Sequence, residues 1–69
     1  MPYVNVKITR EGATSEQKAA VIAQITQTLV DVLDKDPETT FVVIEEVDLD
    51  AWGVAGMPTA RYRALKAAH

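Results

Sequence analysis

Residues 14–33 read TSEQKAAVIAQITQTLVDVL, and this stretch decides the architecture of the chain. Thr14 followed by Gln17 is the capping-box pattern, in which each side chain satisfies a backbone amide of the other residue. Behind it, apolar residues recur at the spacing of three and four that aligns them along one face of a helix. In line with Lys18 these are Val21, Ile22, Ile25, Leu29, Val32 and Leu33. We therefore expect one long amphipathic helix over residues 15–33.

A β-strand is expected on each side of this helix. Before it, residues 3–8 alternate between polar and apolar side chains, which is the period of a half-buried strand. After it, Pro37 ends the helical region because the residue before a proline avoids the α conformation. Residues 40–47 contain the apolar run FVVI, typical of a strand covered on both faces. Strand, helix and strand form a βαβ unit with parallel strands and a right-handed crossover.

The segment after the second strand is rich in small residues. Residues 52–56 read WGVAG, and two glycines within four residues suit a short hairpin or close packing on a neighbour. Residues 60–69 are expected to form either a short helix capped by Thr59 or a frayed tail. The predicted fold class is therefore α+β: a βαβ subunit with two parallel strands, one long helix and a short C-terminal hairpin.

The size of the chain indicates self-association. Its 69 residues allow a single domain over 1–69. A domain of this size buries only about 60% of the surface that its unfolded chain exposes. There is no cysteine and the only histidine is His69, so no disulfide and no metal site are expected. A two-stranded sheet is not stable by itself in water, and we expect oligomerisation to complete the fold.

Charge and hydropathy narrow the class of function. A net charge of −3 argues against a nucleic-acid binder, which usually carries a basic surface. No apolar run approaches the ~20 residues of a membrane span. The N-terminus, MPYVN, lacks the basic and apolar regions of a signal peptide. We expect a cytoplasmic protein without nucleic-acid or membrane partners. The carboxylates of residues 45–50 are interpreted as a solvated acidic rim.

Two residues are candidates for chemistry. If Met1 is removed, Pro2 becomes a secondary amine, and an α-amino group has a pKa of about 7.7–8.0 that burial lowers further. Such a group suits general-base catalysis near neutral pH, although a proline at this position is also common without any role. Trp52, the only tryptophan, is interpreted either as an anchor between subunits or as the wall of a pocket.

The order of these features resembles a known family. Pro2 opens a strand, Glu11-Gly12 precedes the capped helix, Asp36-Pro37 follows it, and an aromatic-Gly-x-x-Gly motif occupies residues 52–56. Over residues 1–56 this order and spacing resemble the 4-oxalocrotonate tautomerase family of the tautomerase superfamily. The resemblance implies an isomerase that catalyses keto–enol tautomerisation without a cofactor. It also implies assembly, usually as a homohexamer, with a dimer or trimer left open.

The resemblance also assigns roles to residues. It implies that Pro2 is the general base, moving a proton between the enol hydroxyl and a carbon of a small 2-hydroxydienoate or enolpyruvate-type acid. Trp52 matches the aromatic residue that lines the pocket. Two arginines of the diacid-specific members are replaced by Ala13 and Phe41. We therefore expect a more apolar pocket, lined by Phe41, that favours a monoacid, with Arg10 as the candidate contact for its carboxylate.

Alternatives to this interpretation stay open. Relatives in the superfamily hydrate or dehalogenate small unsaturated acids on the same fold. A non-catalytic assembly or binding subunit is another alternative, favoured by the two missing arginines and by Met1, which makes the nitrogen of Pro2 an amide wherever it is retained. Arg61 and Arg63 are further candidates for a carboxylate contact if residues 60–69 fold over a pocket.

Overall fold

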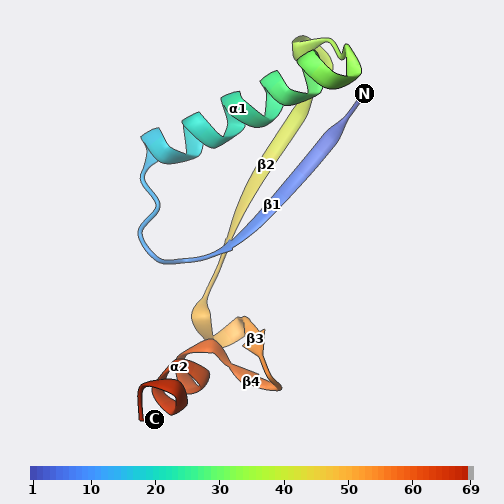
Figure 1. Ribbon diagram of the computed structural model, residues 1–69. Helices are drawn as coiled ribbons and strands as arrows, with labels where there is room; N and C mark the ends of the chain where they lie inside the picture. The colour runs from blue at the N-terminus through green and yellow to red at the C-terminus, as the bar shows by residue number, and fades with distance from the viewer. Residues whose placement is uncertain (69) are drawn as a thin grey trace.

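The computed structural model describes residues 1–68. Figure 1 shows a helix lying across one face of a two-stranded sheet, with a small second lobe at the end of the second strand. The elements are β1 (Tyr3–Thr9), α1 (Ser15–Leu33), η1 (Pro37–Thr39), β2 (Phe41–Val47), η2 (Leu49–Ala51), β3 (Gly53–Val54), β4 (Met57–Pro58) and α2 (Thr59–Ala67), where η marks a 3-10 turn. The predicted α+β class, with its βαβ unit and C-terminal hairpin, is confirmed. No helix among the described residues is long and apolar enough to cross a membrane.

Helix α1 begins as the sequence predicts. The Thr14 hydroxyl accepts a hydrogen bond from the Gln17 amide at 3.1 Å, and the Gln17 side chain accepts one from the Thr14 amide at 2.9 Å. The helix ends at Leu33 because Asp34 adopts the left-handed conformation, with φ of 53°. The Asp34 amide then donates a hydrogen bond to the Val30 carbonyl at 3.0 Å. The end of α1 is thus a left-handed cap that precedes the Asp36-Pro37 break.

The face of α1 that packs on the sheet is narrower than the sequence pattern predicts. Ile25 and Leu29 are half-buried as expected, and Val30 joins them. Val32 is 73% exposed, Leu33 is exposed as well, and Val21 and Ile22 are 40% and 39% exposed. The 19 residues of α1 span about 28 Å at 1.5 Å per residue, whereas a seven-residue strand spans about 23 Å. The last turn of the helix therefore has little sheet beneath it.

The two faces of the sheet differ in what covers them. Strands β1 and β2 pair in parallel, with Tyr3 opposite Phe41 and Thr9 opposite Val47. One face packs against α1. On the other face, Tyr3 is 63% exposed and Phe41 47% exposed, and Val43 follows them two residues along β2. These three apolar side chains, at the beginning of the second face, are uncovered in the single chain.

The subunit has no buried apolar core of its own among residues 1–68. Thr59, at 4% exposure, is the one buried residue there. The radius of gyration is 16.0 Å, against about 11 Å for a compact chain of this length. The accessible surface of 5138 Å² also exceeds the roughly 4,250 Å² of a folded monomer of this mass. The chain is thus more extended and more exposed to solvent than a compact monomer of its size.

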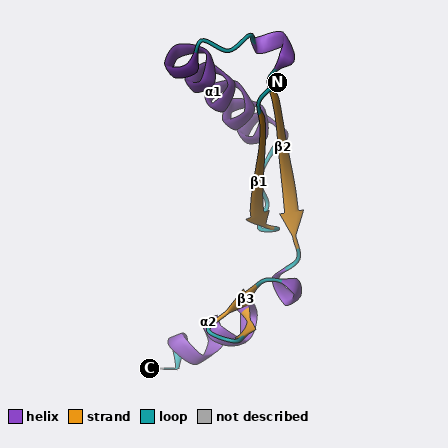
Figure 2. Cartoon of the chain, turned by 90° about the vertical axis from the view of Figure 1, so that its right-hand side faces the viewer, coloured by secondary structure: helices purple, strands orange, loops and turns teal. Residues whose placement is uncertain are grey.

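The C-terminal lobe comprises residues 49–67 and folds mostly on itself. Figure 2 shows it below the βαβ unit, joined to that unit by the end of β2. Strands β3 and β4 pair antiparallel, and the turn between them has Ala55 at φ 53° and Gly56 at φ 81°, both positive as in the tight turns of hairpins. Of the two predictions for residues 60–69, the helix is confirmed by α2, while His69 lies outside the described residues.

The predicted cap of α2 is wrong in one respect. Thr59 is the first residue of the helix, and its side chain does not cap an amide of the first turn. Instead the Thr59 hydroxyl donates a hydrogen bond to the Trp52 carbonyl at 2.6 Å, and the Thr59 amide donates to the same carbonyl at 2.9 Å. This pair of bonds fixes the start of α2 against the entry to the hairpin, which leaves the threonine facing inward.

Candidate active site

Pro2 lies immediately before β1, at the edge where the sheet begins. It is half-buried, and its carbonyl accepts a hydrogen bond from the Phe41 amide at 3.0 Å. Proline has no N–H to contribute to the ladder, so the strand loses nothing by starting here. Met1 is exposed. The bond from Phe41 therefore holds Pro2 to the start of β2 whether or not Met1 is removed.

Arg10 lies at the opposite end of β1 and is held by the end of β2. Its amide donates to the Val47 carbonyl at 2.8 Å. Its guanidinium donates to the Asp48 carboxylate from Nε at 2.8 Å, and to Glu46 from Nη1 at 3.0 Å and Nη2 at 3.3 Å, the last to the main-chain carbonyl. The hydrogen bond and the charge of Asp48 raise the pKa of Arg10 above its ordinary value. Arg10 is thus paired with two carboxylates of its own chain.

Glu46 is shared between two cations. Its Oε2 bonds Arg10, and its Oε1 lies 3.0 Å from Nζ of Lys18 on α1. The Glu46 side chain is only 16% exposed. The interpretation of residues 45–50 as a solvated acidic rim is therefore wrong for this residue. Sequence reasoning missed the pairing because the three residues lie on three different elements and no spacing connects them.

An apolar cleft of about 80 Å³ lies between α1 and the sheet. Its lining consists of Val6, Ile8, Ala13, Gln17, Lys18, Val21 and Ile44. Ala13 thus leaves open space at the position where the diacid-specific enzymes, by the resemblance, carry an arginine. Lys18, which pairs with Glu46, belongs to this lining, whereas Pro2, Phe41 and Trp52 do not.

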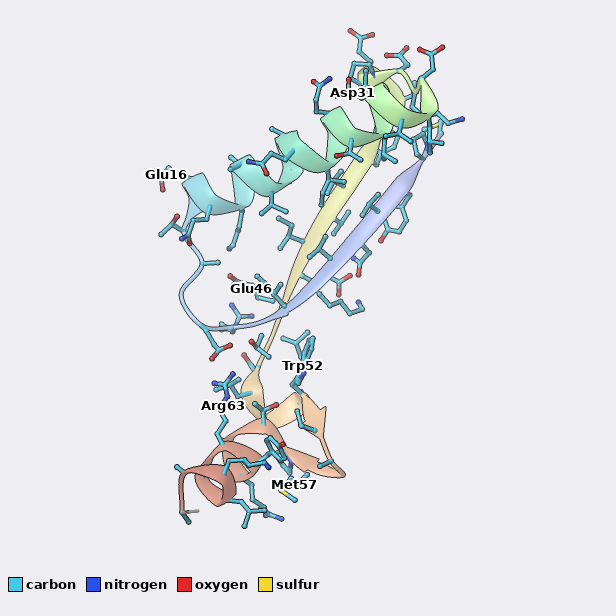
Figure 3. The ribbon with its side chains drawn as sticks, in the orientation of Figure 1. Glu16, Asp31, Glu46, Trp52, Met57 and Arg63 are labelled. Atoms are coloured by element: carbon cyan, nitrogen blue, oxygen red, sulfur yellow. The ribbon has the colours of Figure 1, made fainter. Side chains whose placement is uncertain are left out.

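A single chain brings together only part of the predicted site. Pro2 and Phe41 meet at one end of the sheet. Arg10 stands eight residues further along an extended strand, roughly 25 Å away. Trp52 is half-buried in the C-terminal lobe, and its side chain points from that lobe toward the βαβ unit (Figure 3). A site that contains all four residues needs more than one copy of the chain.

The first loop, residues 10–14, also contacts α2. Arg63 Nη1 bonds the Glu11 carboxylate at 2.5 Å, and the Thr9 hydroxyl bonds the same carboxylate. The bond from Arg63, followed by that from Thr9, lowers the pKa of Glu11 to about 2. Arg63 was expected only as a possible carboxylate contact. The structure pairs it with a carboxylate of its own chain instead.

Comparison with known proteins identifies the family. Residues 2–61 match the family model described as Tautomerase enzyme. The chain is 55% identical over 56 residues to a probable tautomerase, K2, of Dickeya dadantii, covering 81% of this chain and 84% of the relative. It is 39% identical over 56 residues to the 2-hydroxymuconate tautomerase of Bacillus subtilis, covering 81% and 89%.

Solved structures agree with these relatives. The crystal structure of DmpI from Helicobacter pylori superposes with a TM-score of 0.85 at 34% identity, covering 91% of this chain and 97% of that one. A 4-oxalocrotonate tautomerase isozyme from Methylibium petroleiphilum superposes with a TM-score of 0.83 at 33% identity, covering 93% and 98%. The chain belongs to the tautomerase family. It is an isomerase of the 4-oxalocrotonate tautomerase type, as the sequence resemblance implied.

Proposed function

We propose that this isomerase ketonises a small enolpyruvate-type or 2-hydroxydienoate acid without a cofactor, using Pro2 as the general base after removal of Met1. The observation that carries the proposal is the placement of Pro2. It is half-buried and hydrogen-bonded to β2 at 3.0 Å, with the aromatic side chains of Tyr3 and Phe41 at the same end of the sheet. Cover by another subunit would make these surroundings more apolar, which lowers the pKa of an ammonium group toward neutral pH.

The amine of Pro2 alone is enough for both proton transfers of the reaction. Neutral Pro2 accepts the proton of the enol hydroxyl as the carbonyl forms, and the prolinium then donates a proton to the neighbouring carbon. The amine returns to its starting state. Proton transfer by a positioned side chain contributes about 10²–10⁴-fold to a rate, so Pro2 is the residue on which activity should depend most.

Arg10 is proposed as the contact for the substrate carboxylate. A guanidinium has five N–H donors, and the contacts of Arg10 with Asp48 and Glu46 use three of them. Two donors therefore stay available for a carboxylate without breaking either ion pair. Phe41 and Trp52 would line an apolar pocket, so a monoacid with an aromatic or alkyl tail is the proposed substrate class.

Pro2 and Arg10 of one chain lie roughly 25 Å apart, so a site that contains both residues must be shared between subunits. A homohexamer is the proposed assembly. The extended subunit and its uncovered sheet face support self-association. A structural neighbour, from Chloroflexus aurantiacus, is described as a heterohexamer 4-oxalocrotonate tautomerase, at 25% identity and a TM-score of 0.78. Native mass spectrometry should give six times the 7.5 kDa of one chain. The cytoplasmic location stays a prediction.

The test is the pH dependence of phenylenolpyruvate ketonisation, with protein whose intact mass shows that Met1 is absent. We expect a rate well above buffer, controlled by one group that titrates near or below the free α-amino range. The matched control carries one extra residue before Pro2, which turns the nitrogen into an amide, and should be at least about a hundredfold slower. Equal rates for the two proteins would overturn the role of Pro2.

Two further measurements separate the alternatives. Arg10→Gln should raise KM and cost less activity than blocking Pro2, because it removes binding and leaves the base in place. Equal losses would count against the assignment. Chloride release from a 3-haloacrylate, if faster than ketonisation, would favour dehalogenation over tautomerisation.

A further inference from the structure

The first loop is held from two sides by neighbouring residues of opposite charge. Arg10 bonds Glu46 and Asp48 at the end of β2. Glu11 bonds Arg63 of α2 at 2.5 Å. Figure 3 shows the Arg63 side chain extending from α2 toward the loop. The conformation of the loop therefore depends on an element that lies 52 residues further along the chain.

The contact with Arg63 is the link between the two parts of the molecule. Among residues 1–68, it is the only side-chain hydrogen bond or ion pair that joins the C-terminal lobe to β1, the first loop or α1. Otherwise α2 packs on η2, β3 and β4 of its own lobe. Arg63 also lies outside residues 2–61, the part that matches the family model.

The backbone of the loop does not provide this restraint by itself. Gly12 follows Glu11 directly and has φ of +88°, and no atom lies within 4 Å of where its Cβ would be. A glycine with open space around it moves readily between backbone conformations. Side-chain bonds at Arg10 and Glu11 therefore restrain the loop from two sides, Arg10 to the end of β2 and Glu11 to α2.

We propose that Glu11 and Arg63 form a latch through which α2 positions Arg10 for the carboxylate of the substrate. The proposal rests on the function proposed above, in which Arg10 makes that contact. Arg63 is then a positioning residue, because it acts through Glu11 and the loop and touches no substrate itself. The latch makes α2 a part of the substrate-binding apparatus.

The expected effect on KM follows from the solvent exposure of Glu11 and Arg63. Glu11 and Arg63 are both about half exposed, and exposed ion pairs contribute little. We therefore expect KM for phenylenolpyruvate to rise about two- to fivefold in Arg63→Gln and in Glu11→Gln. The value of kcat should stay unchanged because the base at Pro2 is untouched. The contact that weakens, between Arg10 and the substrate carboxylate, is made equally in the ground state and in the transition state.

The chain offers a matched control for these variants. Arg61→Gln removes the same charge from the same helix, and among the described residues Arg61 has no ion-pair partner. It should change KM less than twofold. The exchanged pair, Glu11→Arg with Arg63→Glu, restores the attraction with reversed charges and should return KM to within twofold of the wild-type value. Rescue by exchange would show that the attraction between the two side chains, and not either side chain alone, sets KM.

Hydrogen exchange tests the latch without any substrate. The amides of residues 11–13 should exchange faster in Arg63→Gln than in Arg61→Gln, with both hexamers intact by native mass spectrometry. Equal exchange in the two variants would overturn the latch. Faster exchange with an unchanged KM would overturn its positioning role. If blocking Pro2 abolishes activity while Arg63→Gln matches Arg61→Gln in KM and exchange, only the latch fails and the proposed function stands.

Discussion

Lys18 and Glu46 are joined by an ion pair of 3.0 Å that connects the first turns of α1 to the end of β2. The second oxygen of Glu46 bonds Arg10 at the same distance. One carboxylate that is 16% exposed thus ties the helix, the sheet and the first loop together. Glu46 is therefore the side chain on which this edge of the subunit depends most.

Replacement of Glu46 by Gln should destabilise the protein. The change removes the charge between Lys18 and Arg10 at a site that is 16% exposed, and hydrogen bonds to charged groups contribute about 1.5–3 kcal/mol. We expect the free energy of unfolding to fall by about 1–3 kcal/mol, measured by urea denaturation at fixed protein concentration. Glu45→Gln, which breaks the exposed pair with Lys7, is the control. A loss as large for Glu45 would contradict this account.

The Thr59 hydroxyl should contribute measurably to the C-terminal lobe. Thr59→Val keeps the shape of the side chain and removes its 2.6 Å bond to the Trp52 carbonyl, while the bond from the amide stays. We expect a loss of about 1 kcal/mol, typical of one neutral hydrogen bond. Thr39→Val, which removes an exposed 3.3 Å bond to the Asp36 carbonyl, should cost less. No difference between the two variants would refute the importance of the buried bond.

Substitutions at Ala55 and Gly56, the two neighbouring residues of the hairpin turn, should affect the melting temperature differently. Gly56 has φ of 81° with open space beside it, so Gly56→Ala meets backbone strain but no clash. Ala55 already carries that strain at φ 53°. Because an L-residue pays about 1–2 kcal/mol for this conformation, Gly56→Ala should lower the melting temperature. Ala55→Gly should keep or raise it. Two shifts of the same sign would show that the turn rearranges.

The pH dependence of the latch has a defined window. The pKa of Glu11 is lowered from 4.5 to about 2, chiefly by Arg63. A carboxyl group whose pKa is lower in the folded than in the unfolded protein stabilises the fold at pH values above its unfolded pKa. That contribution is lost as the pH drops through its folded pKa. The difference in urea midpoint between wild type and Glu11→Gln should be constant above pH 4.5 and vanish toward pH 2. A difference that disappears near neutral pH would exclude this assignment.

The low pKa of Glu11 also separates its effect on KM from the titration of Pro2 in kcat. Because Glu11 stays ionised far below neutral pH, the latch is intact throughout the range in which an α-amino group titrates. The ketonisation rate between pH 6 and 9 should therefore report Pro2 alone. Glu11→Gln should keep the same apparent pKa in kcat and differ only in KM. A shifted kcat profile would mean that Glu11 acts on the base.

Short-range sequence patterns were sufficient to predict β1, α1, β2 and the hairpin of this chain. The capping box at Thr14 and Gln17, the period of α1 and the alternation in β1 involve residues close in sequence, so their structure follows from backbone geometry and nearby side chains. The glycine pattern predicted the hairpin for the same reason. Where the pattern was too broad, at Val32, the end of the underlying sheet was the missing information.

Only the tertiary structure decided which charges meet and which candidate residues share a site. Glu46 joins Lys18 and Arg10, and Glu11 joins Arg63, because folding brings together elements that lie far apart in the chain. It also shows that Pro2 and Arg10 stand at opposite ends of one strand, since an extended backbone keeps residues apart in proportion to their separation. The eight residues that separate them in the sequence are extended, so the proposed site that contains both is a property of the assembly.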